Sequence, residues 1–294
     1  MNRICVLMST YNGEKYLTEQ IESILTQKDV EVTLLVRDDG SSDSTNLILN
    51  EYQKQGKLFL IRDGSNIGPA CSFMKLLYDA DDFDYYAFAD QDDIWHTEKL
   101  ITAISMLKTN EDKDIPALYC SNQWILEEGT ITGLRFNHRE HGIVQAICGN
   151  VFSGCTMVFN KKLSTILKQV NNRPSIDVLK LRMHDTWVIA VAECVGIVMY
   201  DENSYIDYRI HSNNTVGLKK GTMTRLKRKL GSKKYRNGRS KLAAELIKLP
   251  IYDENIYDIV KAFATKNRVG LLKRYIIKNS NDKYFIIKTI LGIN

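Results

Sequence analysis

The chain has 294 residues, 44% of them hydrophobic and 26% charged, which is the composition of an ordinary globular protein and excludes a disordered or fibrous one. The apolar run Ile4–Met8 is too short for a signal peptide, and the longest later run, Val188 to Tyr200, is interrupted by Glu193 and too short to span a membrane. We therefore expect a soluble, cytoplasmic protein. The six cysteines include no Cys-x-x-Cys pair, which argues against a zinc site or a disulfide framework.

The first 95 residues alternate short apolar strands with helices whose apolar residues recur at helical spacing. The expected strands are Ile4–Met8, Val32–Val36, Leu58–Ile61 and Tyr85–Ala89, and the expected helices begin near Glu14, Leu47 and Ala70. Strand–turn–helix units in succession predict an α/β fold with a largely parallel sheet. Ligands of such sheets bind beyond the carboxyl ends of the strands, so the polar turns that follow these strands should share one edge.

The second part of the chain is less regular. We expect a helix at Lys99–Leu107, strands around Ala117–Cys120 and Cys155–Phe159, and a buried helix at Asp185–Val195. Beyond Lys219 the pattern is helical and basic. The predicted organisation is one domain at 1–215, with halves at about 1–95 and about 96–215, followed by a helical basic region at 216–294.

An acidic turn, Asp38-Asp39-Gly40-Ser41-Ser42-Asp43, ends the second strand. Its carboxylates can accept hydrogen bonds from a nucleobase imide or a ribose hydroxyl, Gly40 allows close backbone approach, and Asp43 can cap the next helix. The alternative is a surface turn that uses Asp and Gly for turn geometry alone. The position at the carboxyl end of a strand favours nucleotide binding.

A second acidic motif, Asp90-Gln91-Asp92-Asp93, follows the fourth strand. Carboxylates beside a nucleotide diphosphate would repel it unless a divalent cation lay between them, and Mn²⁺ or Mg²⁺ prefers such oxygen ligands. A bound cation would also stabilise the departing diphosphate. The alternative is a solvated acidic loop, which three crowded carboxylates at a strand end make less favourable.

Two further motifs lie later in the chain. Asp185, preceded by His184, stands where the apolar helix begins and could act as a general base or simply cap that helix. In Tyr208-Arg209-Ile210-His211, the Arg209 and His211 side chains suit diphosphate oxygens, and a neutral His211 could complete a metal shell. A lone histidine is more often structural.

In this order and spacing, Ser-Thr-Tyr-Asn-Gly at 9–13, the acidic turns at 38–43 and 90–93, and His-Asp at 184–185 resemble glycosyltransferase family 2. The resemblance covers about residues 1 to 215 and implies the GT-A fold, a Rossmann-like sheet flanked by helices. It implies that 1–215 is the catalytic domain, with a nucleotide-binding half at about 1–95 and an acceptor half at about 96–215. It implies that Asp39 contacts the nucleobase of the donor and that Asp92 is the best candidate for direct metal contact. It also implies that Asp185 is the catalytic base of an inverting enzyme.

The candidate residues fall into three groups. The nucleotide-binding group is Thr10, Tyr11, Asn12, Glu14, Asp38, Asp39, Asn66, Gly68, Asp90 and Gln91. The diphosphate-binding group is Arg209 and His211, and the metal-binding group is Asp92, His211 and Asp90. Asp185 is the candidate catalytic residue, and Mn²⁺ or Mg²⁺ the expected cofactor.

The runs Asp-Gln-Asp-Asp-Ile-Trp and Tyr-Arg-x-His-Ser-Asn-Asn look similar to bacterial rhamnosyltransferases of surface polysaccharide assembly, which implies dTDP-L-rhamnose as donor. The acceptor would be a saccharide or a lipid-linked saccharide. The Gln-x-x-Arg-Trp signature of processive synthases is absent, which favours addition of a single sugar. A nucleotidyltransferase and a non-catalytic nucleotide-sugar binding protein are the alternatives.

Eleven Lys and Arg residues and no acidic ones lie between Lys219 and Lys241, although the net charge of the whole chain is only +5. This segment could lie on an anionic membrane surface, which would make the protein peripheral on the inner face, or it could pack on the catalytic domain. No nucleic-acid motif or aromatic platform accompanies the charge, so we expect no nucleic-acid partner.

Overall fold

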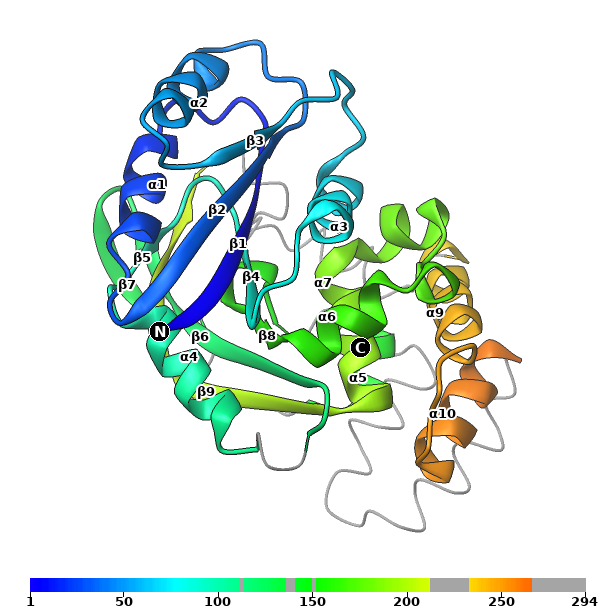
Figure 1. Ribbon diagram of the computed structural model, residues 1–294. Helices are drawn as coiled ribbons and strands as arrows, with labels where there is room; N and C mark the ends of the chain where they lie inside the picture. Colours follow the sequence, from blue (N-terminus) through cyan, green and yellow to red (C-terminus); the bar gives the residue numbers. More distant parts are fainter. Residues whose placement is uncertain (111–113, 136–140, 150–151, 212–232, 266–294) are drawn as a thin grey trace.

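The computed structural model describes residues 1–110, 114–135, 141–149, 152–211 and 233–265 (Figure 1). The strands are β1 (Asn2–Thr10), β2 (Val30–Asp38), β3 (Phe59–Ile61), β4 (Tyr85–Ala89), β5 (Ile94–Trp95), β6 (Ala117–Glu127), β7 (Thr130–Leu134), β8 (Val158–Asn160) and β9 (Ile197–Ile210). The helices are α1 (Leu17–Leu25), α2 (Thr45–Lys54), α3 (Pro69–Asp79), α4 (Lys99–Lys108), α5 (Ile143–Cys148), α6 (Lys161–Lys168), α7 (Ile176–Val195), α9 (Lys233–Leu246) and α10 (Glu254–Ala264), with 3-10 turns η2 (Gly154–Thr156) and η3 (Val170–Asn172).

The described strands form one sheet in the order β3-β2-β1-β4-β8-β6-β9-β5, with β7 beside β6. The pairs β1–β2, β1–β4, β2–β3 and β6–β9 are parallel. The first four strands in the chain therefore point the same way, so the turns that follow them lie at one edge. The predicted α/β class, with parallel strands in the first part of the chain, is confirmed.

Helices cover both faces of the sheet, because residues along a strand alternate between the two faces. On β1, Ile4, Val6 and Met8 join a core with α1, α2 and α4, whereas Cys5 and Leu7 face α3 and α7. Figure 1 shows α1 and α2 on one side of the sheet and α3, α6 and α7 on the other. Two apolar layers thus hold the carboxyl edge in place.

Helix α7 contains a break at Met183, whose φ of 65° and ψ of 162° are not helical. A positive φ is unfavourable for a residue with a side chain, so packing around this residue must hold it there. A new helical segment starts at His184, which agrees with the predicted helix start at Asp185. The break therefore places His184 and Asp185 at the start of a helical segment inside α7.

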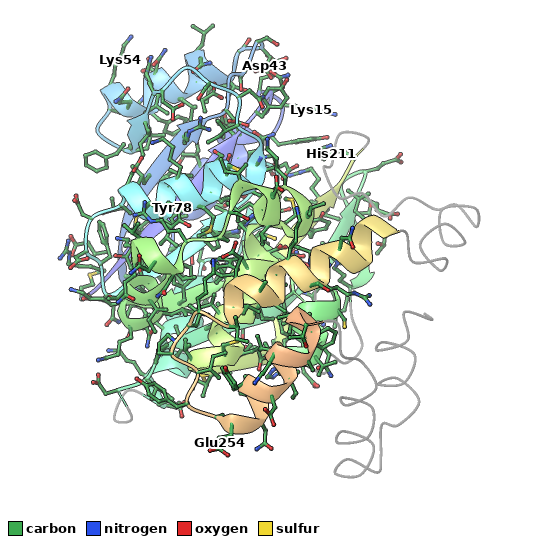
Figure 2. The ribbon with its side chains drawn as sticks, turned by 90° about the vertical axis from the view of Figure 1, so that its right-hand side faces the viewer. Lys15, Asp43, Lys54, Tyr78, His211 and Glu254 are labelled. Atoms are coloured by element: carbon green, nitrogen blue, oxygen red, sulfur yellow. The ribbon has the colours of Figure 1, made fainter. Side chains whose placement is uncertain are left out.

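The described part of the C-terminal region packs against the catalytic half. Leu242, Ala243 and Leu246 of α9, and Val260 and Phe263 of α10, are buried in the core that contains α7. Figure 1 shows α9 and α10 beside α5 and α7, and in Figure 2 Glu254 at the start of α10 lies at the end of the molecule opposite Asp43, Lys15 and His211. Within the described ranges, we find no helix with the length and apolar character needed to cross a bilayer. The predicted boundary at 215/216 and most of the basic segment lie outside the described residues.

Candidate active site

A cleft of about 310 Å³ opens at the carboxyl edge of the sheet, where the parallel strands end. It brings together Asp39, Asp92 and Asp185, although these residues come from three separate parts of the chain. The predicted residues that line it are Thr10, Tyr11, Asp39, Asn66, Gly68, Asp90, Gln91, Asp92 and Asp185. Most of the candidate site is therefore one continuous surface.

Asp39 is buried at the floor of the nucleotide side and fixed by three donors. Its Oδ1 accepts from the Arg37 guanidinium (2.6 Å) and from Ile67 N (2.8 Å), and its Oδ2 accepts from Gly68 N (2.9 Å). Arg37 is itself fully buried and forms an ion pair with Asp63 (2.7 Å). Because a carboxylate has about four acceptor positions, Asp39 retains about one for a ligand.

Three predicted nucleotide residues do not line the cleft but build the turns around it. Asp38 accepts from Thr10 Oγ1 (2.9 Å) and Ser41 N (2.9 Å). Asn12 Oδ1 accepts from Ser42 N, and Glu14 Oε2 from Ser44 N, both at 2.8 Å. These bonds join the turn after β1 to the turn after β2. The three side chains therefore stabilise the turns that form the cleft without lining it themselves.

Gln91 connects the turn after β4 to the turn after β1. Its Oε1 accepts from Tyr11 N (2.8 Å), and its Nε2 donates to Tyr11 O (3.0 Å). A Cβ on Gly13 would lie 2.3 Å from Gln91 Oε1, so only glycine fits there. The motif after β4 is thereby held against the turn after β1.

The two residues predicted for the diphosphate lie beside Asp92, outside the cleft lining. His211 Nε2 is 2.7 Å from Asp92 Oδ2. Arg209 donates to Asp92 O (3.0 Å) and to the Glu19 carboxylate (2.6 Å). Arg209 lies near the end of β9 and His211 directly follows this strand, which pairs with β5 next to the acidic motif. Their geometry fixes the loop that carries Asp92.

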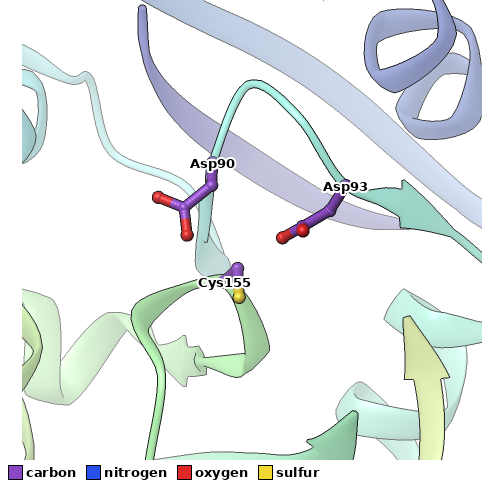
Figure 3. Close-up of side chains that lie close together, drawn as sticks. All are labelled: Asp90, Asp93 and Cys155. Carbon is purple, nitrogen blue, oxygen red and sulfur yellow. The ribbon is translucent and has the colours of Figure 1, made fainter. Parts of the chain in front are cut away.

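Asp93 and Cys155, which the sequence analysis did not single out, lie next to Asp90. One ligand atom from each of the three residues falls within 4.8 Å of the others (Figure 3). Burial raises the pKa of Asp93 and of the Cys155 thiol well above their ordinary values. Burial therefore favours the uncharged forms of Asp93 and Cys155. Asp90, next to them, lines the cleft.

Asp185 lies at the other end of the cleft, 7% exposed, and its Oδ1 accepts from Thr186 N (2.6 Å). Its neighbour His184 stacks on Phe73 with ring centroids 4.2 Å apart. A Cβ on Gly154 would lie 2.6 Å from His184 Nε2 and 3.6 Å from Asp185 Cβ. The η2 turn therefore packs closely against His184 and Asp185.

The carboxylates of the cleft fit a divalent cation. Burial, together with the charges of Asp92 and Asp185, raises the pKa of Asp90 to about 7. Such repulsion between carboxylates is relieved by a cation, and Asp90, Asp92 and the His211 imidazole are of the oxygen and nitrogen types that Mn²⁺ or Mg²⁺ accepts. Among the described residues, the ligand atoms within 4.8 Å of one another belong to Asp90, Asp93 and Cys155, so a cation held by Asp90, Asp92 and His211 would require these three side chains to approach one another.

Two lining residues of the cleft, Arg135 and Ser153, were not predicted from the sequence, and two more, His184 and Tyr208, were named only as parts of motifs and without a role. Arg135 follows β7 and bonds to Ser153, which precedes η2. No short motif marks Arg135 or Ser153. They are brought together by the pairing of β6 with β7, β8 and β9.

The family model for "Glycosyl transferase family 2" matches residues 5–166. The chain belongs to glycosyl transferase family 2. It is 32% identical over 254 residues to the dTDP-rhamnosyl transferase RfbG of Shigella flexneri, covering 81% of this chain and 84% of that protein. It is 30% identical over 161 residues to an Escherichia coli protein named UDP-Glc:alpha-D-GlcNAc-diphosphoundecaprenol beta-1,3-glucosyltransferase WfgD, covering 54% and 61%.

Solved structures agree on the fold of this glycosyltransferase. S. aureus TarS 1-349 in complex with UDP-GlcNAc superposes with a TM-score of 0.63 at 17% identity, covering 95% of this chain and 74% of that one. The mannosyltransferase PcManGT of Pyrobaculum calidifontis, in complex with GDP-Man and Mn²⁺, superposes with a TM-score of 0.57 at 14% identity, covering 98% and 79%. The predicted family and fold are thus confirmed.

Proposed function

We propose that this glycosyltransferase transfers a single sugar, with inversion, from a nucleotide diphosphate donor to a hydroxyl of a saccharide or lipid-linked saccharide in cell-surface polysaccharide synthesis. The observation that carries the proposal is the single cleft shared by Asp39, Asp92 and Asp185. The reaction needs three features in one place: a carboxylate that contacts the nucleobase, an acidic motif that can hold a metal, and a general base.

The proposed donor is dTDP-L-rhamnose. The similarity to the dTDP-rhamnosyl transferase over most of both chains supports it. The one acceptor position left on Asp39 suits the single imide N–H of thymine, and Phe73 and Met183 offer apolar contact for the methyl group of a 6-deoxy sugar.

In the proposed reaction, Asp185 takes the proton of the acceptor hydroxyl as its oxygen attacks the anomeric carbon from the side opposite the diphosphate. Asp90, Asp92 and His211 would hold Mn²⁺ or Mg²⁺, which would supply Lewis-acid stabilisation of the leaving group. Arg209 supports this side by holding the backbone of Asp92. The catalytic domain is proposed to be residues 1–215.

A panel of nucleotide sugars, including dTDP-L-rhamnose, UDP-glucose and UDP-GlcNAc, tests the donor by thermal unfolding with and without Mn²⁺. A ligand present at about 100 times its Kd stabilises the folded state by about 2.7 kcal/mol. We expect the largest Mn²⁺-dependent shift with dTDP-L-rhamnose. A clear preference for another nucleotide sugar would replace the proposed donor.

Asp185→Asn tests the chemistry. The amide cannot accept the proton, so we expect turnover to fall by about 10²–10⁴ while the donor Kd stays within about two-fold. Transfer is measured with the best donor of the panel, and donor hydrolysis without acceptor separates an enzyme from a simple binding protein. Near wild-type turnover by this variant would show that Asp185 is not the general base. Release of inorganic pyrophosphate from a nucleoside triphosphate would instead identify a nucleotidyltransferase.

A further inference from the structure

The charges that line the cleft are unbalanced. Asp39, Asp90, Asp92 and Asp185 contribute four carboxyl groups, whereas Arg135 is the sole arginine or lysine among the described lining residues. A donor diphosphate brings further negative charge into the same space. Like charges in a partly buried site repel strongly, so the single cation has a large effect on what can bind.

Arg135 is held in a fixed orientation. Its Nη1 donates to Gln123 Oε1 (2.6 Å) and to Ser153 Oγ (2.5 Å), and its guanidinium carbon lies 4.9 Å from the centre of the Tyr208 ring. Gln123 is fully buried, and Ser153 Oγ also donates to Gln123 Oε1 (3.0 Å). A planar guanidinium fixed in this way is suited to paired hydrogen bonds with phosphate oxygens.

The position of Arg135 is also specific. Ser153, its bonding partner, is followed by Gly154, whose Cβ position lies 3.6 Å from Asp185 Cβ. Arg135 also lines the same cleft as Asp90 and Asp92. It thus shares one cleft with the candidate base and the acidic motif, where the bond between sugar and diphosphate would be broken.

We propose that Arg135 binds an oxygen of the donor's β-phosphate, an inference that rests on the proposed function. In the transfer, the acceptor oxygen bonds to the anomeric carbon and its proton passes to Asp185. The bond from that carbon to the β-phosphate oxygen breaks, and its electron pair remains on the phosphate. Arg135 donates N–H groups to the charge that grows there. This role differs from that of Arg209, which holds the Asp92 backbone and Glu19.

Binding of a diphosphate and of a monophosphate distinguishes this role from general support of the fold. The affinities of the full chain for dTDP and dTMP are measured by titration calorimetry, in EDTA and again in Mn²⁺, with UDP and UMP as a second pair. Because a charge-assisted hydrogen bond is lost, we expect Arg135→Gln to weaken dTDP binding about ten-fold to one hundred-fold and to change dTMP binding by less than about two-fold. The matched control is Arg173→Gln, since Arg173 is exposed and also lies over a tyrosine, Tyr78.

Equal weakening of both nucleotides, or of neither, would overturn the inference. Unchanged nucleotide binding with a raised acceptor KM would also overturn it and assign Arg135 to a phosphate of the acceptor. If Arg135→Gln does not melt like the wild type, Arg135→Met, which retains packing on Tyr208, replaces it. A wild-type chain that binds none of these nucleotides would instead overturn the proposed function itself.

Discussion

His184 and Asp185 are neighbours in the chain but need opposite environments. Asp185 must accept a proton in the proposed reaction, whereas His184 is 4% exposed and neither ring nitrogen has a hydrogen-bond partner in the described structure. Burial alone lowers the pKa of His184 to about 3, so the ring is neutral at physiological pH. An uncharged aromatic ring next to the base leaves the Asp185 carboxylate without a neighbouring imidazolium that would lower its basicity.

The buried histidine predicts a pH-dependent stability. The unfolded chain binds a proton at this side chain below pH 6.5, and the folded chain does so only below about pH 3. The contribution is therefore present above pH 6.5 and lost as the pH falls, by about 2 kcal/mol between pH 7 and pH 5. The free energy of unfolding of His184→Asn, measured by urea titration, should fall less than that of the wild type over this range.

Comparison of the two proteins at each pH is essential, because the raised pKa of Asp90 acts in the opposite direction. A carboxyl that holds its proton in the folded state stabilises that state at low pH. This effect is common to both proteins and cancels in the difference. Parallel curves for the wild type and His184→Asn would show that His184 is not buried as a neutral ring.

The acidic residues of the cleft could be predicted from the sequence, whereas the positively charged Arg135 could not. Asp39 directly follows β2, Asp92 belongs to the acidic motif that follows β4, and parallel strands place such residues at one edge. Arg135 stands at the end of the short strand β7, in a segment without a catalytic motif. Glu128 and Gly129 both have positive φ, as a two-residue hairpin loop between β6 and β7 requires, but Glu-Gly is not the Asn-Gly or Asp-Gly pair that marks such a loop in a sequence.

At the scale of elements, the η2 turn connects the parts of the site that the sequence analysis treated separately. Ser153, just before it, bonds to Arg135, Gly154 contacts His184, and Cys155 lies beside Asp90 and Asp93. The break in α7 at Met183 brings the base to this turn. A sequence reveals the apolar helix and the strand β8, but contact between a turn and a helix start depends on packing of the complete sheet.

Gly154→Ala tests this arrangement. The new Cβ would lie 2.6 Å from His184 Nε2 and 3.6 Å from Asp185 Cβ, so the η2 turn and the start of the second helical segment must move apart. Misplacement of a catalytic group by about 1 Å can cost about 10²-fold in rate, so we expect kcat to fall by that order while the donor Kd changes little. Steady-state kinetics and calorimetry measure the two quantities.

Gly149→Ala is the matched control, because no atom of the described residues lies within 4 Å of a Cβ at this position and its φ of −154° suits any residue. It should retain wild-type kcat. Equal losses in the two variants would mean that any glycine replacement in this region disturbs the fold. Full activity of Gly154→Ala would show that the η2 turn does not position the base.

At the scale of the whole molecule, the C-terminal region is partly a layer of the fold. The apolar residues of α9 and α10 complete the core next to α7, and Lys241 forms an ion pair with Asp177 of α7 (2.8 Å). Of the two roles considered for this region, packing on the catalytic half therefore holds for the described residues 237–264. Contact with a membrane remains a prediction that rests on the basic residues between Lys219 and Lys241, most of which lie outside the described residues.

This division of roles predicts how membrane binding would behave. Because the apolar residues of α9 and α10 are already buried, we expect the contact to depend on charge rather than on insertion of an apolar face. Each cation near an anionic surface contributes about 1 kcal/mol, and salt screens the attraction. In sedimentation with vesicles, we expect binding to phosphatidylglycerol at low salt, release at high salt, and no binding to phosphatidylcholine. Replacement of Lys219, Lys220 and Arg225 by Gln should weaken it, whereas salt-resistant binding, or equal binding to neutral vesicles, would contradict this electrostatic contact.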